Sequence, residues 1–133
     1  MPRLQVNTPN AVFCDNKVAV KDPDKYVLVE VIVEKVLHSW KDSILSFEFL
    51  NTDGSLRMER ELSPKNQERR GVVENKIRDK KVVEHPILGI GLMDNIEIGS
   101  GRDVFMTLAG QGYSTLPVHI RIAQKDEFKA YIV

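Results

Sequence analysis

The sequence contains one cysteine, few aromatic residues and no net charge. Cys14 has no second cysteine to pair with, so an internal disulfide and a multi-cysteine zinc site are both excluded. Lysine plus arginine and aspartate plus glutamate each number 19, which gives a formal net charge of zero. A chain with this balance lacks the overall charge that draws proteins to nucleic acid or to anionic membranes. We therefore expect no nucleic-acid partner.

Long apolar runs are also missing. The longest, PILGIGLM at 86–93, is far shorter than the roughly 20 residues of a membrane helix. The first ten residues, MPRLQVNTPN, lack the apolar segment of a signal peptide. A single cysteine fits a reducing compartment. The sequence therefore predicts a soluble, cytoplasmic protein without membrane contact.

Length and composition predict one globular domain spanning residues 1–133. The chain is 42% hydrophobic and 29% charged, which is ordinary for a folded domain and unlike a disordered one. The first 16 residues have weak periodicity, so we expect an irregular arm or an edge strand there. The three histidines, His38, His85 and His119, lack zinc-ligand spacing. We expect no metal ion and no cofactor.

Valine-rich segments predict strands in the first third of the chain. KVAVK at 17–21 is short and alternating, and YVLVEVIVEKVL at 26–37 is dense in β-branched residues. A helix is the alternative over 26–37. Both faces of this predicted strand carry apolar side chains, so a second copy of the chain is expected to cover one of them, giving a homodimer.

Residues 43–62 predict a β-hairpin turning at Asn-Thr-Asp-Gly. A two-residue loop would place Glu48 opposite Glu59, whereas a four-residue loop (51–54) pairs Glu48 with Arg57. Opposed like charges are destabilising, so we predict the four-residue loop. It also pairs Phe49 with Leu56, and Phe47 with Met58.

Over residues 63–83 the spacing of the apolar side chains changes from the alternation of a strand to that of a helix, which predicts a helix. Ser63 suits the N-cap and Pro64 the first helical position. The many basic side chains interleave with acidic ones and with no aromatic residue. We interpret them as a solvated helix face rather than a nucleic-acid contact.

Strand patterns return after His85-Pro86. The order of strands, one helix and more strands excludes a doubly wound parallel sheet, which needs several crossover helices. We predict an α+β fold: a mainly antiparallel sheet, open or closed as a small barrel, with one principal helix near the middle of the chain. The expected strands are 87–93, 95–98, 103–109, 116–124 and 128–132.

GIGLMDNIEIGSGRD at 89–103 holds four of the eight glycines. A third glycine at dinucleotide-loop spacing and a Gly-Lys-Ser/Thr ending are both absent. We predict two turns, at 93–95 and 99–102. A binding loop is the alternative, since consecutive N–H groups of a glycine-rich turn hold anions and Arg102 is adjacent. Ser100 does not resemble a hydrolase nucleophile, which needs a strand-to-helix turn.

His119 and Arg121 form the most informative polar pair. At positions i and i+2 of a predicted strand they share one face, where arginine supplies a bidentate donor and histidine a titratable one. We expect a small binding or accessory protein that holds an anionic ligand or a protein partner. The alternatives are a small hydrolase or isomerase using carboxylates and His119, favoured by a pocket joining His119 to Asp94 or Asp103, and a purely structural subunit. The candidate ligand-binding residues are His119, Arg121, Arg102, Tyr113, Asp94 and Asp103, with no catalytic residue assigned.

Overall fold

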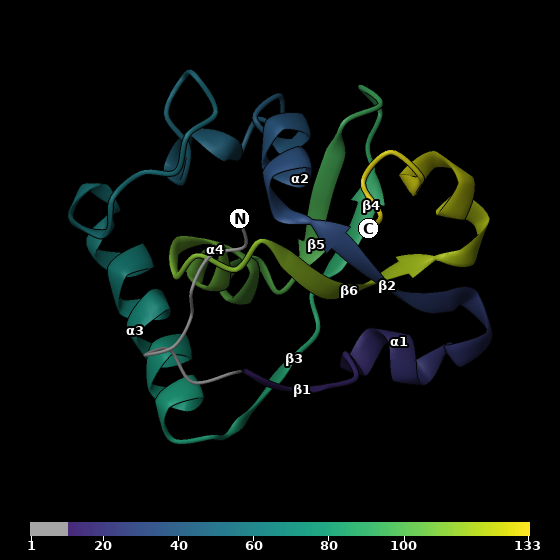
Figure 1. Ribbon diagram of the computed structural model, residues 1–133, viewed down its shortest axis with the longest axis horizontal. Helices are drawn as coiled ribbons and strands as arrows, with labels where there is room; N and C mark the ends of the chain where they lie inside the picture. The colour runs from purple at the N-terminus through teal and green to yellow at the C-terminus, as the bar shows by residue number, and fades with distance from the viewer. Residues whose placement is uncertain (1–10) are drawn as a thin grey trace.

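The computed structural model describes residues 11–133, which form an α+β fold with two open sheets (Figure 1). In the larger sheet the strands β2–β6 and β4–β5 are antiparallel and β4–β6 is parallel, while the smaller sheet pairs β1 with β3 in parallel. The α+β prediction is confirmed, but the sheets are mixed and the larger one does not close into a barrel. The strands, in sheet order, are β2 (Tyr26–Ile32), β6 (Thr115–Arg121), β4 (Ile87–Ile90) and β5 (Ile96–Ser100), then β1 (Val12–Cys14) and β3 (Val82–Glu84).

The described part of the chain contains four α-helices, so the prediction of one principal helix was incomplete. The longest of them, α3, lies within the range predicted to be helical, and the Ser63 side chain accepts a hydrogen bond from the Asn66 amide at its N-terminus. The helices are α1 (Lys17–Lys21), α2 (Val33–Trp40), α3 (Pro64–Arg78) and α4 (Arg102–Gly110), with 3-10 turns at Pro23–Lys25, Ser46–Glu48, Glu59–Glu61 and Ile122–Phe128.

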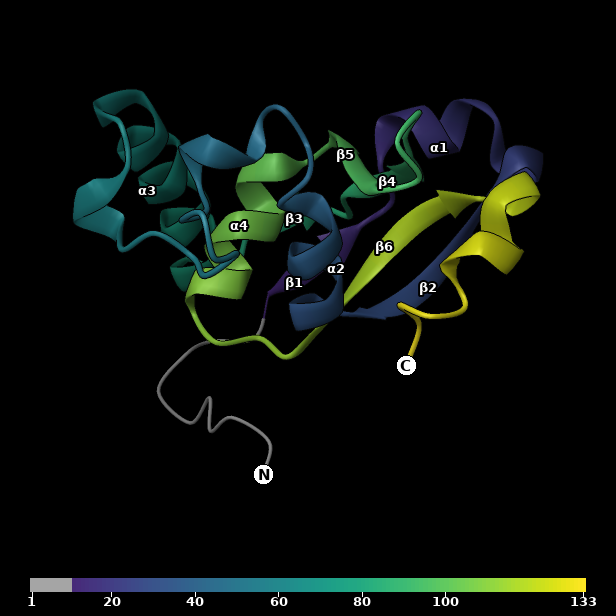
Figure 2. The same ribbon diagram turned by 90° about the horizontal axis from the view of Figure 1, so that it is seen from above.

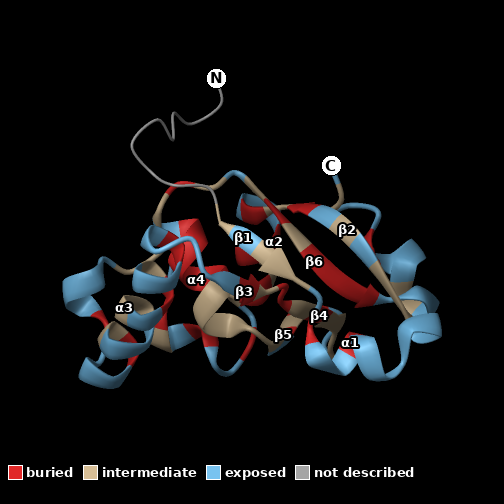
Figure 3. Ribbon diagram, turned by 90° about the horizontal axis from the view of Figure 1, so that it is seen from below, coloured by how far each residue is buried: buried red, intermediate tan, exposed pale blue. Residues whose placement is uncertain are grey.

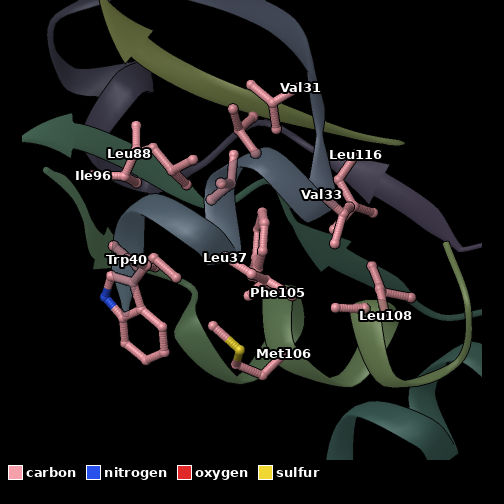
Figure 4. Packing of buried hydrophobic residues seen from close by; sticks show 14 of the residues in the cluster. Val31, Val33, Leu37, Trp40, Leu88, Ile96, Phe105, Met106, Leu108 and Leu116 are labelled. Atoms are coloured by element: carbon pink, nitrogen blue, oxygen red, sulfur yellow. The ribbon is translucent and has the colours of Figure 1, made fainter. Parts of the chain in front are cut away.

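The hydrophobic core lies between the larger sheet and helices α2 and α4. Figure 4 shows Leu37 of α2 and Phe105 of α4 close together between the elements, and both belong to one buried cluster with Trp40 and the strand residues Leu88 and Ile96. Burying side chains of this size contributes about 1.5–3 kcal/mol each. This packing fixes the position of α4 against the end of β5.

Helix α1 lies on the other face of the sheet. Figure 1 shows α2 above and α1 below the β2–β6 pair, whose strands lie side by side in Figure 2, and Figure 3 shows α1 and β1 beside β6. Leu28 and His119 are cross-strand partners on that face, next to the buried Ala19 of α1. Both sheet faces are therefore at least partly covered within the chain.

Two predicted strands near the start are partly or wholly helical. Residues 17–21 form α1 because the Asn16 side chain accepts a hydrogen bond from the Val18 amide and caps the helix. The predicted strand 26–37 stops at Ile32, after which the chain becomes α2. Its buried residues, Val33, Val36, Leu37 and Trp40, follow the helical spacing i, i+3, i+4 and i+7.

The predicted strand 103–109 is also wrong, since these residues belong to α4. Gly101 adopts a left-handed conformation with φ 78°, which turns the chain from β5 directly into the helix. Phe105, Met106, Leu108 and Ala109 are buried, so the segment is apolar on most sides and has no strand-like alternation. The turn at residues 99–102 therefore joins a strand to a helix, not a strand to a strand.

The predicted hairpin register was shifted by one residue. An isolated bridge pairs Leu50 with Leu56, so Phe49 does not face Leu56, and the loop holds five residues, 51–55. Asp53 stabilises this longer loop by accepting hydrogen bonds from the Ser55 amide and hydroxyl. The Arg57 amide donates to the Phe49 carbonyl, so the predicted pairs Glu48–Arg57 and Phe47–Met58 are not formed either. The segment forms 3-10 turns in place of two full strands.

The chain ends beside β2. The predicted strand 116–124 ends at Arg121 as β6, and the predicted strand 128–132 is replaced by the end of a 3-10 turn and one bridge, Val31 to Ile132. The Val133 amide donates to the Glu30 carbonyl, so the chain's own C-terminus covers part of the β2 edge. Within the arm or edge strand expected over 1–16, Val12–Cys14 form β1, and 1–10 lie outside the described residues.

Candidate functional site

Two histidines meet where β4 and β6 run side by side. His119 of β6 is paired with Ile87 of β4, and His85 lies two residues before that strand. The two rings make an edge-on contact with centroids 5.3 Å apart, and Phe13 of β1 stacks on His85 at 4.7 Å. Both histidines are buried. The fold therefore places a pair of imidazoles beneath the β1–α1 segment.

Asn16 joins this pair to the start of α4. Its amide N–H donates to His119 Nε2 at 3.3 Å, and its Nδ2 donates to the His85 carbonyl at 3.0 Å and to Ser100 Oγ at 3.1 Å. The residue is 2% exposed, and its Oδ1 also caps α1. The Asn16 side chain is therefore fully hydrogen-bonded, and it holds α1, β3–β4 and β5–α4 together.

These hydrogen bonds fix the neutral forms of both histidines. His119 Nε2 accepts the Asn16 N–H, so its ring proton lies on Nδ1. His85 Nδ1 lies 3.2 Å from the Pro117 carbonyl, which can only accept, so His85 carries its proton there. Burial lowers the pKa of both histidines below the usual value. Asp15 opposes this shift at His119, from which its carboxylate is 3.6 Å away, and the Pro117 hydrogen bond opposes it at His85.

The turn at residues 100–102 leads directly into the N-terminus of α4. No side chain caps the N-terminus of α4, and the first backbone bond of the helix runs from the Phe105 amide to the Gly101 carbonyl. The amides of residues 102–104 therefore have no hydrogen-bond partner within the helix, at the end where the helix dipole favours negative charge. Arg102, the first helical residue, is half-buried and its Nε makes no hydrogen bond.

A separate hollow of about 190 Å³ opens beside His119, on the α1 side. Its walls are mostly apolar, and one end carries the Asp15–His119 pair. Neither Asp94 nor Asp103 lines it, so this hollow does not join His119 to those carboxylates. The lining residues are Asp15, Ala19, Val20, Pro23, Tyr26, Leu28 and His119.

The remaining predicted residues are distributed around the fold. Arg121 is exposed, with its Cζ 5.9 Å from the centre of the Tyr26 ring. Asp94 is exposed at the tip of the β4–β5 turn, with φ 59°. Asp103 lines a small hollow between α3 and α4, and the Tyr113 hydroxyl accepts from the Ala11 amide. Asn16 contacts His119 and also Ser100, two residues before Arg102, whereas Asp94 and Asp103 belong to other surfaces.

Little in the sequence marked Asp15, Asn16 and His85 as neighbours of His119. An asparagine directly before KVAVK is a helix-cap signal, and it was masked by the alternation of the next residues. Ser100 was discounted because a strand was predicted to come after it. The apolar cluster after Arg102 was the available signal for the helix.

Comparison with protein-family models, with curated proteins and with solved structures found no match. Within residues 11–133 no group of three or more histidine, cysteine, aspartate or glutamate side chains is arranged to hold a metal ion. In the same residues no helix has the length and apolar character required to cross a bilayer. The function is therefore inferred from the geometry of the turn, the histidine pair and the hollow.

Proposed function

We propose that this protein is a cytoplasmic binding protein that holds a small anionic ligand, a phosphate or a carboxylate, at the turn of residues 100–102. The observation that carries the proposal is the uncapped N-terminus of α4, which opens on a glycine turn and begins with Arg102. Free helix amides and a guanidinium are complementary to phosphate and carboxylate oxygens. Ser100 Oγ adds a hydroxyl to the same turn.

The charges of the neighbouring groups favour the turn over the hollow as the place where an anion binds. The Asp15 carboxylate is 3.6 Å from His119 Nε2 at the end of the hollow, so an anion there would meet a like charge. Asp103 is the second residue of α4, but it lines the hollow that faces α3. We therefore assign the anion to the amides at the N-terminus of α4. Asn16 connects this turn to the two histidines, since it hydrogen-bonds to Ser100, to His119 and to the His85 carbonyl.

The histidine pair gives this binding a pH dependence. A bound anion favours the charged imidazolium and raises the pKa of a nearby histidine. In the free protein burial lowers the pKa of His85 and His119, so both rings are neutral at pH 7. Binding then takes up protons, and affinity increases as the pH falls toward those pKa values.

A thermal-shift screen of phosphate, sulfate and small carboxylates at pH 6 and pH 8 tests the proposal. The expected result is a stabilising anion with a larger shift at pH 6. Arg102→Gln removes the guanidinium at the turn, and Arg121→Ala removes the exposed arginine of β6. Loss of the shift in Arg102→Gln alone supports the turn, loss in Arg121→Ala alone moves the site to the β6 face, and no shift with any anion contradicts anion binding.

A protein partner is a second proposal, carried by exposed apolar side chains. Ile44 is 86% exposed, Leu92 105% and Met93 81%. The Ser43 hydroxyl donates to Glu97, so the segment holding Ile44 lies against the β4–β5 hairpin that holds the other two. Surface of this kind favours association, and we propose that it forms the homodimer interface. Light scattering should give a dimer mass for the wild type and the 15.1 kDa monomer for Leu92→Glu. A monomeric wild type at micromolar concentration would contradict the interface.

A further inference from the structure

The hollow beside His119 is built from side chains that remain exposed although they are apolar. Val20 of α1 is 60% exposed and Leu28 of β2 is 47% exposed, and both line it. Ala19, Pro23 and Tyr26 also line it. The hollow is open to solvent, and its volume of about 190 Å³ is comparable to the ~150 Å³ of an enclosed cavity that holds benzene. Covering these side chains with an apolar group would remove their surface from water.

The polar end of the hollow is negative. Asp15 has no lysine or arginine within ion-pair distance among the described residues, and its carboxylate lies 3.6 Å from His119 Nε2. His119 is neutral and its Nε2 is occupied by the Asn16 N–H. It therefore neither neutralises Asp15 nor offers that nitrogen to a ligand. A carboxylate without a cation at the end of an apolar hollow is complementary to a positive charge.

Arg121 places a positive charge toward the Tyr26 end of the hollow. Arg121 pairs across the strands with Tyr26, and His119 with Leu28, so the arginine is two residues along β6 from His119. This spacing corresponds to about 7 Å along the strand. The guanidinium lies over the Tyr26 ring. A bound cation is therefore directed to the Asp15 end, with its apolar body over Val20 and Leu28.

We propose that this hollow is a second ligand site, distinct from the anion site, that takes a primary ammonium attached to a compact apolar ring. The ammonium pairs with the Asp15 carboxylate, and the ring covers Val20, Leu28 and Pro23. The site requires nothing of the α4 turn. Anion binding and ammonium binding can therefore fail independently, because one is probed with phosphate and the other with an amine.

The test is a titration of the full chain with benzylammonium, benzyl alcohol and benzoate, followed by ¹⁵N–¹H NMR at pH 7.5. These probes share the ring and differ in charge. Shifts are expected at residues lining the hollow, and not at the amides of residues 102–104. Because Asp15 is solvent-exposed, its ion pair should favour benzylammonium over the alcohol by roughly two- to fivefold in affinity. Benzoate should bind most weakly.

Three variants complete the experiment. Asp15→Asn should make benzylammonium and benzyl alcohol bind equally, whereas Asp24→Asn, an exposed aspartate that does not line the hollow, should leave the preference unchanged. Val20→Lys places a like charge in the hollow at an exposed position and should abolish ammonium binding. Equal binding of the charged and neutral probes to the wild type, or an equal effect of Asp15→Asn and Asp24→Asn, would overturn the proposal.

Discussion

Replacing Asn16 by alanine should be one of the most damaging single substitutions of a polar residue in this chain. The change removes the α1 cap, which is worth about 1 kcal/mol. It also leaves the His85 carbonyl without the Nδ2 donor 3.0 Å away. A buried polar group left unsatisfied costs about 1–3 kcal/mol. The free energy of unfolding should therefore fall by about 2–4 kcal/mol, which corresponds to a melting temperature lower by roughly 10 °C for a chain of this size.

Urea denaturation followed by circular dichroism measures this loss, and two further variants identify its origin. Asn16→Ser keeps a cap-forming hydroxyl but not the Nδ2 donor, so it should recover about 1 kcal/mol of the loss. Asn51→Ala, which removes a hydrogen bond to Ser55 in a surface loop, should cost less than about 0.5 kcal/mol. An Asn16→Ala variant as stable as Asn51→Ala would refute the central role given to Asn16.

Three other outcomes are expected. Burial lowers the pKa of His85 and His119 below 6.5 in the folded chain, so the unfolded chain binds more protons. The free energy of unfolding should therefore be highest above about pH 6.5 and should decrease as the pH falls through the folded pKa values. His119→Gln should flatten this dependence, measured by denaturation at pH 5 to 8. Gly101→Ala should cost at least about 2 kcal/mol, because φ is 78° and a Cβ there would lie 2.9 Å from Pro86 Cα, whereas Gly71→Ala, with open space in mid-helix, should stabilise the chain by up to about 1 kcal/mol. Affinity for duplex DNA, measured by fluorescence anisotropy, should be weak and should disappear as salt rises through the physiological range; tight, salt-resistant binding would contradict this expectation.

Local sequence patterns were sufficient to predict an element where its apolar residues keep the spacing of one type of secondary structure throughout. Ser63 and Pro64 are at the start of α3, and Val118 and Ile120 share one buried face of β6, although His119 on the opposite face is buried too. They were insufficient where apolar residues are dense on every side. Residues 26–37 and 103–109 are such segments, and there the period of burial depends on which neighbours cover the chain.

The candidate site depended on those same segments. His119 and Arg102 were selected by residue type, but their relation through Asn16 depends on α1 and α4, two helices that were expected to be strands. Contacts between residues about 100 positions apart, such as Asn16 to His119, leave no trace in local periodicity. Of the turn predicted at 99–102 only Gly101 lies between elements, since β5 extends to Ser100 and α4, which was missed, begins at Arg102.

The most direct test of the anion site is a ¹⁵N–¹H NMR titration of the full chain with inorganic phosphate at pH 6 and pH 8. Binding at the start of α4 should produce saturable shifts led by the amides of residues 102–104. The affinity should be higher at pH 6, and the shifts should be lost in Arg102→Gln but kept in Arg121→Ala. Phosphate that leaves those amides unmoved while shifting others, or shifts that persist in Arg102→Gln, would contradict an anion site at this turn.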